Sequence, residues 1–216
     1  MRGGYFRRLF HAAVTGQVLT ALGVVFMLRA NIGLEPWSVF QQGLVDRLGI
    51  SFGTTSVLIS LVAVAIALAL GERIGLGTVF SVVVPGPVID WLLAMGWIPL
   101  QGGLAGGLVF LLLGLEFLTL GTYFYMKPGL GSGPRDAMCV AIARRTGRSV
   151  GLCRSCIEGC AIAVGALLGG PVGVGTVVAM VGIGLLIDLN FRLLRFDPRA
   201  VRQETLADTL RALWHK

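Results

Sequence analysis

The sequence predicts an all-α, polytopic membrane protein of about six transmembrane helices, arranged as two inverted three-helix repeats. Three observations lead to this prediction. The chain is rich in apolar residues and poor in charge, its apolar runs are long enough to cross a bilayer, and its second half repeats the first at one spacing. Each repeat is expected to hold one interrupted half-helix, and an amphipathic helix is expected at the C-terminus.

The composition excludes an ordinary soluble domain. Hydrophobic residues make up 55% of the chain and charged residues 13%, against about 25% charged in soluble proteins. The 32 glycines suit close packing of helices in lipid. The net charge of +7 comes from basic residues at the ends of apolar runs, where they orient the chain and contact headgroups. We therefore expect a lipid bilayer as partner, and no nucleic acid.

An ungapped repeat relates the two halves. Gly33 and Gly131 stand 98 residues apart, and the same spacing relates Ile89-Asp90 to Ile187-Asp188. It also relates the Gly-Leu-Gly-Thr-Val segment at 75–79 to the Gly-Val-Gly-Thr-Val segment at 173–177. One spacing held through these different motifs indicates a duplicated structural unit rather than shared composition.

The first repeat is predicted at residues 11–93, after a basic N-terminus at 1–10. Three apolar runs predict spans, and the stripe of apolar residues between the first two predicts a half-helix that dips into the membrane or lies on it. Pro85 and Pro87 are expected to kink the third span. The spans are placed at 12–28, 52–70 and 74–93, and the half-helix at 36–48.

The second repeat is predicted at residues 104–190, after an uncharged link at 94–103. Its spans are placed at 104–126, 151–168 and 174–189, and its half-helix at 134–146. In the tail, 191–216, Asp197-Pro198 is typical of a helix start. The apolar residues that follow predict an amphipathic helix on the membrane surface, or alternatively a solvated helix.

Basic residues set the predicted orientation. Six spans with a cytoplasmic N-terminus put the basic link at 127–149 and the basic tail inside, and the uncharged links at 94–103 and 169–173 outside in the periplasm. Because each repeat has an odd number of spans, the second enters the membrane from the opposite face. The repeats are therefore expected to be inverted.

The two glycine-proline segments are the leading candidates for a solute site. Inside a membrane, irregular backbone is tolerated only in protein or beside water, and half-helix N-termini offer unpaired N–H groups to an anion. The alternative is a tight turn that caps a surface helix. The expected solute-binding residues are Gly33, Glu35, Pro36, Ser38, Gly131, Ser132, Gly133, Pro134, Arg135 and Asp136.

Four acids within or near the spans are candidates for proton coupling. Glu116 lies at the centre of an apolar run, where an ionisable group is costly and usually functional. A neutral Glu116 hydrogen-bonded between helices is the alternative. Glu158 follows Arg154 by one helical turn, so it also suits a structural ion pair. Asp90 and Asp188 share one repeat position and also suit helix caps or contacts between repeats.

The cysteines and the missing motifs limit the chemistry. Cys153, Cys156 and Cys160 form one helical stripe that suits a soft metal or redox chemistry, although cysteine is more often a small packing residue. They are weak metal candidates. The sequence has no Walker loop, no His-Glu-x-x-His and no Gly-x-Ser-x-Gly motif. We expect neither an enzyme nor a cofactor.

At these residues the sequence resembles the YczE family of bacterial membrane proteins, within a broader YczE/YyaS/YitT group. The resemblance covers roughly residues 12–190 and is most specific at 129–136 (Gly-Leu-Gly-Ser-Gly-Pro-Arg-Asp). Glu35 and Ser38 depart from the family's usual Gly and Asp. The resemblance implies a multi-pass protein of the bacterial inner membrane, and it implies no particular substrate.

The pattern favours a small secondary transporter for an anionic or zwitterionic solute, with alternating access between inverted repeats and possible proton coupling. A homodimer is expected, because six short spans make a thin wall around a moving site. Two alternatives remain open at this stage: a membrane scaffold or regulatory protein without transport, and a thiol- or soft-metal-handling membrane protein.

Overall fold

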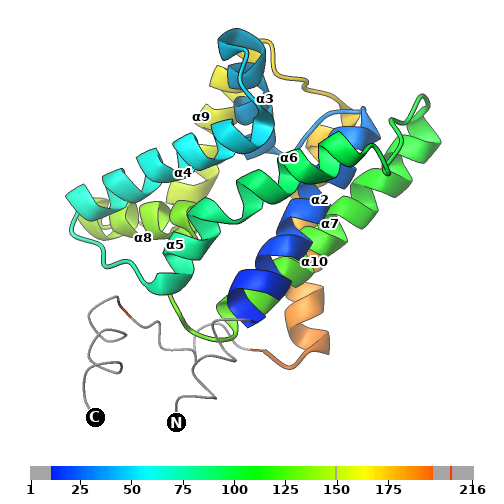
Figure 1. The fold of residues 1–216 in the computed structure, drawn as a ribbon. Helices are drawn as coiled ribbons and strands as arrows, with labels where there is room; N and C mark the ends of the chain where they lie inside the picture. Colours follow the sequence, from blue (N-terminus) through cyan, green and yellow to red (C-terminus); the bar gives the residue numbers. More distant parts are fainter. Residues whose placement is uncertain (1–10, 149, 197–204, 206–216) are drawn as a thin grey trace.

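The computed structural model describes residues 11–148, 150–196 and 205, and throughout them all regular secondary structure is helical (Figure 1). The basic segment at 1–10 and the amphipathic helix expected after Asp197 lie outside the described residues. The helices of the first half are η1 (His11–Gly16, π-helical), α2 (Gln17–Ala30), α3 (Pro36–Leu48), α4 (Phe52–Ala69), α5 (Leu76–Val83) and α6 (Pro85–Met95). Those of the second half are α7 (Leu104–Met126), α8 (Pro134–Thr146), α9 (Val150–Leu167) and α10 (Val174–Leu193).

The helix boundaries recur at the spacing of the sequence repeat. α3 and α8, α4 and α9, and the α5–α6 pair and α10 begin and end 98 residues apart. One difference separates the halves. In the first half, the helical segment from Leu76 to Met95 breaks between α5 and α6 at Pro85, because proline cannot donate a backbone hydrogen bond. In the second half, α10 runs through the equivalent position as one helix.

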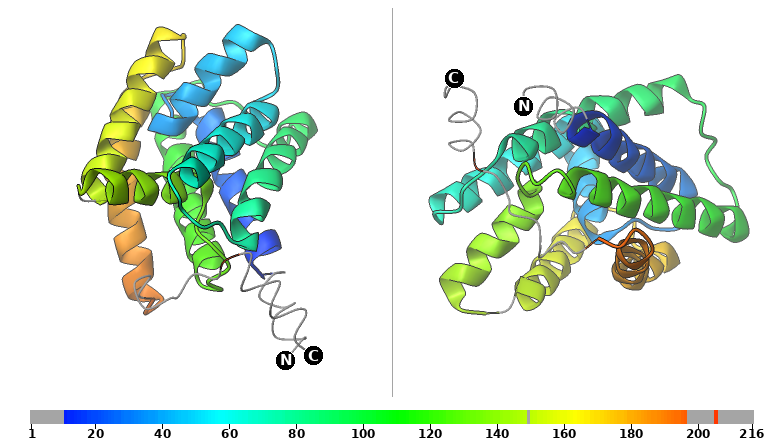
Figure 2. Two further views of the ribbon diagram at one scale, coloured as in Figure 1. Left: turned by 90° about the vertical axis from the view of Figure 1, so that its left-hand side faces the viewer. Right: turned by 90° about the horizontal axis from the view of Figure 1, so that it is seen from below.

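An antiparallel pair, α2 and α7, forms the centre of the molecule (Figure 2). Gly16, just before α2, packs against Gly121, and Gly23 packs against Gly114, so the order of contacts along one helix is reversed along the other. A Cβ atom added to Gly23 would lie 2.6 Å from the carbonyl oxygen of Gly114. The two backbones therefore touch, and the apolar core is built around this contact.

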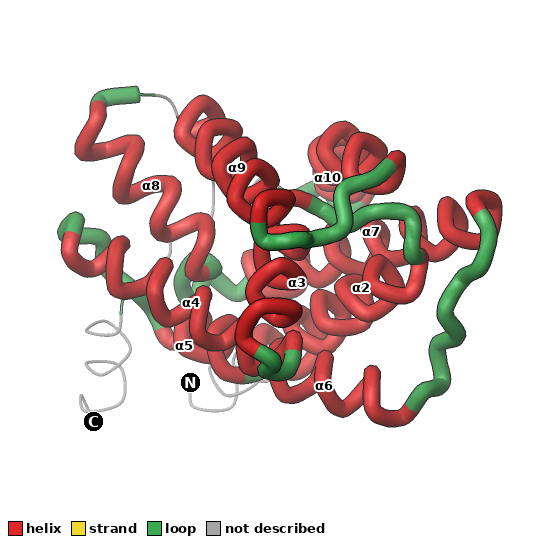
Figure 3. Tube along the Cα trace, turned by 90° about the horizontal axis from the view of Figure 1, so that it is seen from above, coloured by secondary structure: helices red, strands yellow, loops and turns green. Residues whose placement is uncertain are grey.

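Around this centre, each half packs against the other in a reciprocal way. Between the halves, α3 packs on α9 and α8 packs on α4 (Figure 3). Within each half, α6 lies against α2 and α10 lies against α7. The contact of α3 with α9 is matched by the equivalent contact of α8 with α4, as expected for two copies related by an approximate twofold axis. The halves are interlocked rather than two separate domains.

Large apolar side chains cover the outer faces of α4, α7 and α10, including Leu61, Val109 and Leu185. Four helical segments are long and apolar enough to cross a membrane: Phe52–Ala69, Leu76–Met95, Leu104–Met126 and Val174–Leu193. Val14–Ala30 is a shorter apolar helix, and α9 carries Arg154 and Glu158. The described residues thus form a helical membrane-protein architecture, and the count of six spans stays a prediction.

The glycine contact at the centre is testable. Gly114→Ala should lower the melting temperature of the purified protein in detergent, because the new methyl group would meet the Gly23 carbonyl oxygen and Met27 at 2.7 Å. Overpacking of this kind costs about 1–3 kcal/mol. The matched control is Gly184→Ala in α10, where no atom lies within 4 Å of the added Cβ. Equal melting temperatures for the two variants would contradict the contact.

Candidate functional site

Two glycines hold the irregular segments against the opposite half. Gly33 and Gly131 have φ values of +108° and +121°, which favour glycine. A Cβ on Gly33 would lie 2.8 Å from the Thr176 hydroxyl oxygen, and one on Gly131 would lie 2.9 Å from that of Thr78. The Thr78 hydroxyl also donates a 2.7 Å hydrogen bond to the Ser132 carbonyl. Each segment is therefore fixed by the start of a helix in the other half, α10 for the first segment and α5 for the second.

The N-terminus of α3 is capped by its own carboxylate. Glu35 is only 4% exposed and accepts hydrogen bonds from the Trp37 and Ser38 backbone N–H groups at 3.1 Å each, and from the Ser38 hydroxyl at 3.0 Å. Pro36 is the first helical residue. Glu35 thus satisfies the N–H groups that the sequence had suggested for a bound anion.

The N-terminus of α8 is built differently. Its N-cap is Gly133, which has no side chain, and Pro134 begins the helix. Asp136 lies in the first turn, accepts a 2.9 Å hydrogen bond from the Tyr125 hydroxyl and pairs with Arg154 at 3.3 Å. A carboxylate is thus again present at the helix start, here supplied from inside the first turn.

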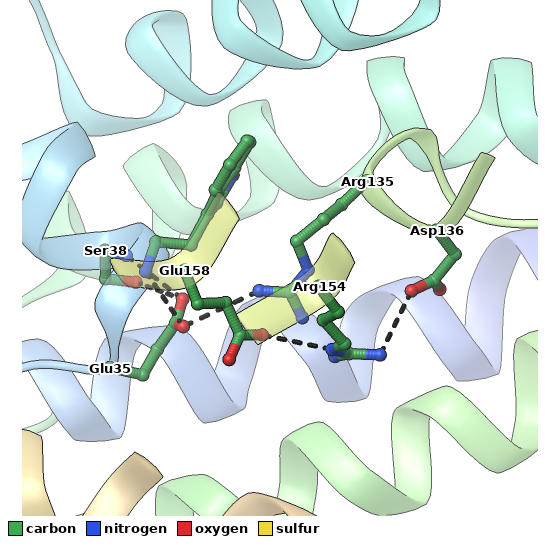
Figure 4. Close-up of polar contacts among 7 residues, drawn as sticks. Glu35, Ser38, Arg135, Asp136, Arg154 and Glu158 are labelled. Atoms are coloured by element: carbon green, nitrogen blue, oxygen red, sulfur yellow. Dashed lines mark hydrogen bonds and ion pairs between the residues drawn. The ribbon is translucent and has the colours of Figure 1, made fainter. Parts of the chain in front are cut away.

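The two N-termini converge on one small cavity of about 150 Å³ between the halves. Arg135 crosses it: Nη1 lies 3.6 Å from Glu35 Oε2, and the guanidinium carbon lies 5.9 Å from the centre of the Trp37 ring (Figure 4). Polar side chains of the first half make up much of the remaining wall, and Tyr125 and Asp136 of the second half complete it. Those of the first half are Gln17, Thr20, Ser38, Gln41, Ser56, Ser60 and Ser81.

Behind the cavity a second guanidinium joins the cluster. Arg154 on α9 donates to Glu158 at 3.0 Å and contacts Asp136 at 3.3 Å (Figure 4). Glu35 pairs with Arg135, and Arg154 pairs with both Asp136 and Glu158. Because Arg135 and Asp136 are neighbours in the sequence, these five side chains form one charge cluster that joins α3, α8 and α9. Of the expected solute-site residues, Glu35, Ser38, Gly133, Pro134, Arg135 and Asp136 line the cavity.

A larger cavity of about 1050 Å³ lies on the other side of the first segment. Gly33 and Leu34 line this larger cavity, whereas Glu35, the next residue, lines the smaller one. Polar side chains on its wall include Arg29, Asn31, Gln42, Asp46, Ser51 and Asp90. The first segment is therefore the partition between the two spaces.

The four candidate proton-coupling acids have different surroundings. Glu158 belongs to the charge cluster. Glu116 is half-buried on α7 and lines neither cavity. Asp90 accepts hydrogen bonds from the Ser51 hydroxyl and the Gly53 N–H, so it caps α4, and Asp188 is exposed on α10. A role in proton coupling stays a prediction for each of them.

The three cysteines of the stripe differ in exposure. Cys153 is buried with its sulfur 3.9 Å from the Thr146 hydroxyl, while Cys156 and Cys160 are exposed beside an apolar groove that Trp37 and Phe40 also line. Within the described residues, no three His, Cys, Asp or Glu side chains are placed to hold a metal ion. The stripe therefore gathers no ligand set there.

Several residues of the cavity were not expected from the sequence. Ser56 and Ser60 line it from α4, Tyr125 lines it from α7, and the Gln17 amide donates a 2.6 Å hydrogen bond to Ser81. The spacing of Ser56 and Ser60, four residues apart in an apolar run, places both on one helix face. That pattern is the signal in the sequence that points to a polar wall.

The fold and the apolar outer faces define a multi-pass helical membrane protein. More particularly, the chain belongs to a family of unknown function, DUF6198, whose model matches residues 6–192. It is 30% identical over 169 residues to an uncharacterized protein of Haemophilus influenzae, which covers 78% of this chain and 77% of that one. It is also similar to two Bacillus subtilis proteins, the uncharacterized membrane protein YczE (27% identical, 80% of each chain) and the uncharacterized protein YyaS (25%, 80% and 87%). No solved structure matches significantly.

The fit of Gly131 gives one prediction. Gly131→Ala should lower the melting temperature more than Gly49→Ala, although both replace a glycine with positive φ. An alanine in the left-handed region costs about 1–2 kcal/mol at either position. Only at position 131 would the methyl group also collide with Gly75 and Thr78, because nothing lies within 4 Å of a Cβ at position 49. Equal losses in thermal unfolding would contradict the close fit.

The Glu35–Arg135 ion pair gives a second prediction. A double-mutant cycle with Glu35→Gln and Arg135→Gln, read as free energies of unfolding in mixed micelles, should give a coupling of about 0.5–3 kcal/mol because the pair is largely buried. The same cycle on Glu72 and Arg144 should give less, since the Arg144 side chain is 66% exposed. A smaller coupling for the buried pair than for the control would contradict this.

Proposed function

We propose that this protein is a small secondary transporter of the bacterial inner membrane, in which two inverted repeats give alternating access to the cavity between α3 and α8. The observation that carries the proposal is the convergence of two repeat-equivalent helix N-termini on one polar space. Discontinuous helices that meet between repeats are typical of secondary transporters. The solute would pass unchanged, without catalysis.

The helix directions support inverted insertion. α2 and α7 are equivalent in the repeat and antiparallel in space, so the approximate twofold axis that relates them runs across both helices. If both helices cross the bilayer, this axis lies in the membrane plane. The basic residues of the 127–149 link and of the tail favour cytoplasmic termini.

The two cavities support an exchange between two states. The 1050 Å³ cavity reaches the partition at Gly33 and Leu34 from one side, and the 150 Å³ cavity begins at Glu35. In the proposed cycle the larger cavity is the vestibule of one face. Movement of one repeat against the other would close it and open the equivalent path along Leu130 and Gly131. We propose a homodimer as the working unit and Glu158 as the acid through which protons are coupled.

Alternating access can be tested without knowing the solute. In a variant with all four cysteines replaced, Ser60→Cys should react with a membrane-impermeant maleimide added to either side of oriented vesicles. Leu115→Cys, at a fully buried position, should react from neither side. Labelling of Ser60→Cys from one side alone would overturn the transporter and leave a scaffold with a static pocket.

Inverted insertion can be tested with a matched pair of positions. Leu48 and Thr146 are repeat-equivalent, exposed, and close to the C-terminal ends of α3 and α8. Leu48→Cys should be labelled only from the periplasmic side, and Thr146→Cys only from the cytoplasmic side. Labelling of both from one side would overturn inverted insertion, and with it the proposed mechanism.

A further inference from the structure

The charges around the small cavity do not balance. Three charged side chains line it: the carboxylates of Glu35 and Asp136, and the guanidinium of Arg135. Behind them Arg154 and Glu158 contribute one charge of each sign. With all five ionised, this part of the described structure carries one surplus negative charge. A half-buried carboxylate that shares its cation with another acid favours a cationic group on the ligand.

Both helix N-termini at the cavity already have an anionic group. Glu35 caps α3, and Asp136 occupies the first turn of α8. A simple anion entering the cavity would raise the surplus to two negative charges. The cavity is therefore poorly suited to an anion that enters alone, although the sequence had suggested a cradle for one at each helix start.

Arg135 nevertheless retains the capacity to bind a carboxylate. Its contacts within the described structure are one Glu35 oxygen at 3.6 Å, longer than a hydrogen bond, and the face of Trp37. A guanidinium has five N–H donors and binds carboxylates through two of them at once. The cavity thus offers a donor group for an anion and a surplus charge for a cation.

We propose that the solute is a small zwitterion, with its carboxylate on Arg135 and its ammonium group facing Asp136 and the serine hydroxyls of the opposite wall. Such a ligand leaves the net charge of the site unchanged, and it gives Arg135 a carboxylate and Asp136, which shares Arg154 with Glu158, an ammonium group. The cavity volume of about 150 Å³ limits it to few atoms, since pockets for drug-sized ligands span about 300–1,000 Å³. This inference rests on the proposed function, because it names the solute class of the same site.

The test is equilibrium binding of radiolabelled probes to the full chain in nanodiscs at pH 7 and constant ionic strength. The probes are glycine, β-alanine, acetate and methylammonium. At least one zwitterion should bind tenfold or more tightly than both single-charge probes. Tighter binding of acetate or methylammonium, or no binding of either zwitterion, would overturn the proposal. Acetate that binds more tightly at pH 5 than the zwitterions do would also overturn the proposal. In that case a proton, rather than an ammonium group, would neutralise the surplus negative charge.

Two variants should shift the selectivity in opposite directions. Arg135→Gln should weaken zwitterion binding at least tenfold and leave methylammonium binding equal or stronger. Asp136→Asn removes the surplus charge and should strengthen acetate binding at least threefold while it weakens zwitterion binding. Arg135→Lys keeps the positive charge and should lose less zwitterion binding than Arg135→Gln. It also replaces the glutamine variant if that variant does not fold. Glu72→Gln, in an ion pair outside the cavity, is the control and should match the wild type. Parallel losses for all probes in both cavity variants would contradict the charge argument.

The outcome is distinguishable from failure of the transporter proposal. Zwitterion binding together with one-sided labelling of Ser60→Cys would support the ligand class and overturn transport. Two-sided labelling together with preferred binding of acetate would support transport and overturn the ligand class.

Discussion

Two backbone hydrogen bonds between the halves set the structure of the irregular segments. Gly77 N–H donates to the Leu130 carbonyl at 2.7 Å, and Gly175 N–H donates to the Ile32 carbonyl at 2.8 Å. In lipid, backbone polar groups outside a helix must find partners within the protein. Here each segment finds its partner at the start of a helix in the other half. Neither half can therefore complete its own fold alone, which explains why the two are interlocked.

The backbone hydrogen bonds that hold the two irregular segments are equivalent in both halves, but the side chains of the two segments differ. Glu35, Trp37 and Ser38 occupy the positions that Gly133, Arg135 and Asp136 occupy in the second copy. Duplication gave two equivalent helix starts, and divergence made one of them supply the buried acid and the other the guanidinium. The cavity is formed by both together, so its chemistry belongs to the pair rather than to either repeat.

The repeat spacing predicted the half-helices well because local signals define their ends. Pro36 and Pro134 begin them, and Gly49 and Gly147, both left-handed, end them. The Arg135–Glu35 contact could not be predicted, because it depends on how two distant segments cross. Glu116 shows the same limit: its place in an apolar run marked it as unusual, but periodicity alone did not show that it lines neither cavity.

The break at Pro85 has a consequence for energetics. Only the first half contains this break, since α10 continues through the equivalent position. In the proposed transport cycle this break stays with Pro85 in the first half, so the two states are not related by an exact twofold rotation. No symmetry therefore requires the two states to have the same free energy. A resting population would favour one of them, and the kinetic barriers on the two sides of the cycle would be unequal.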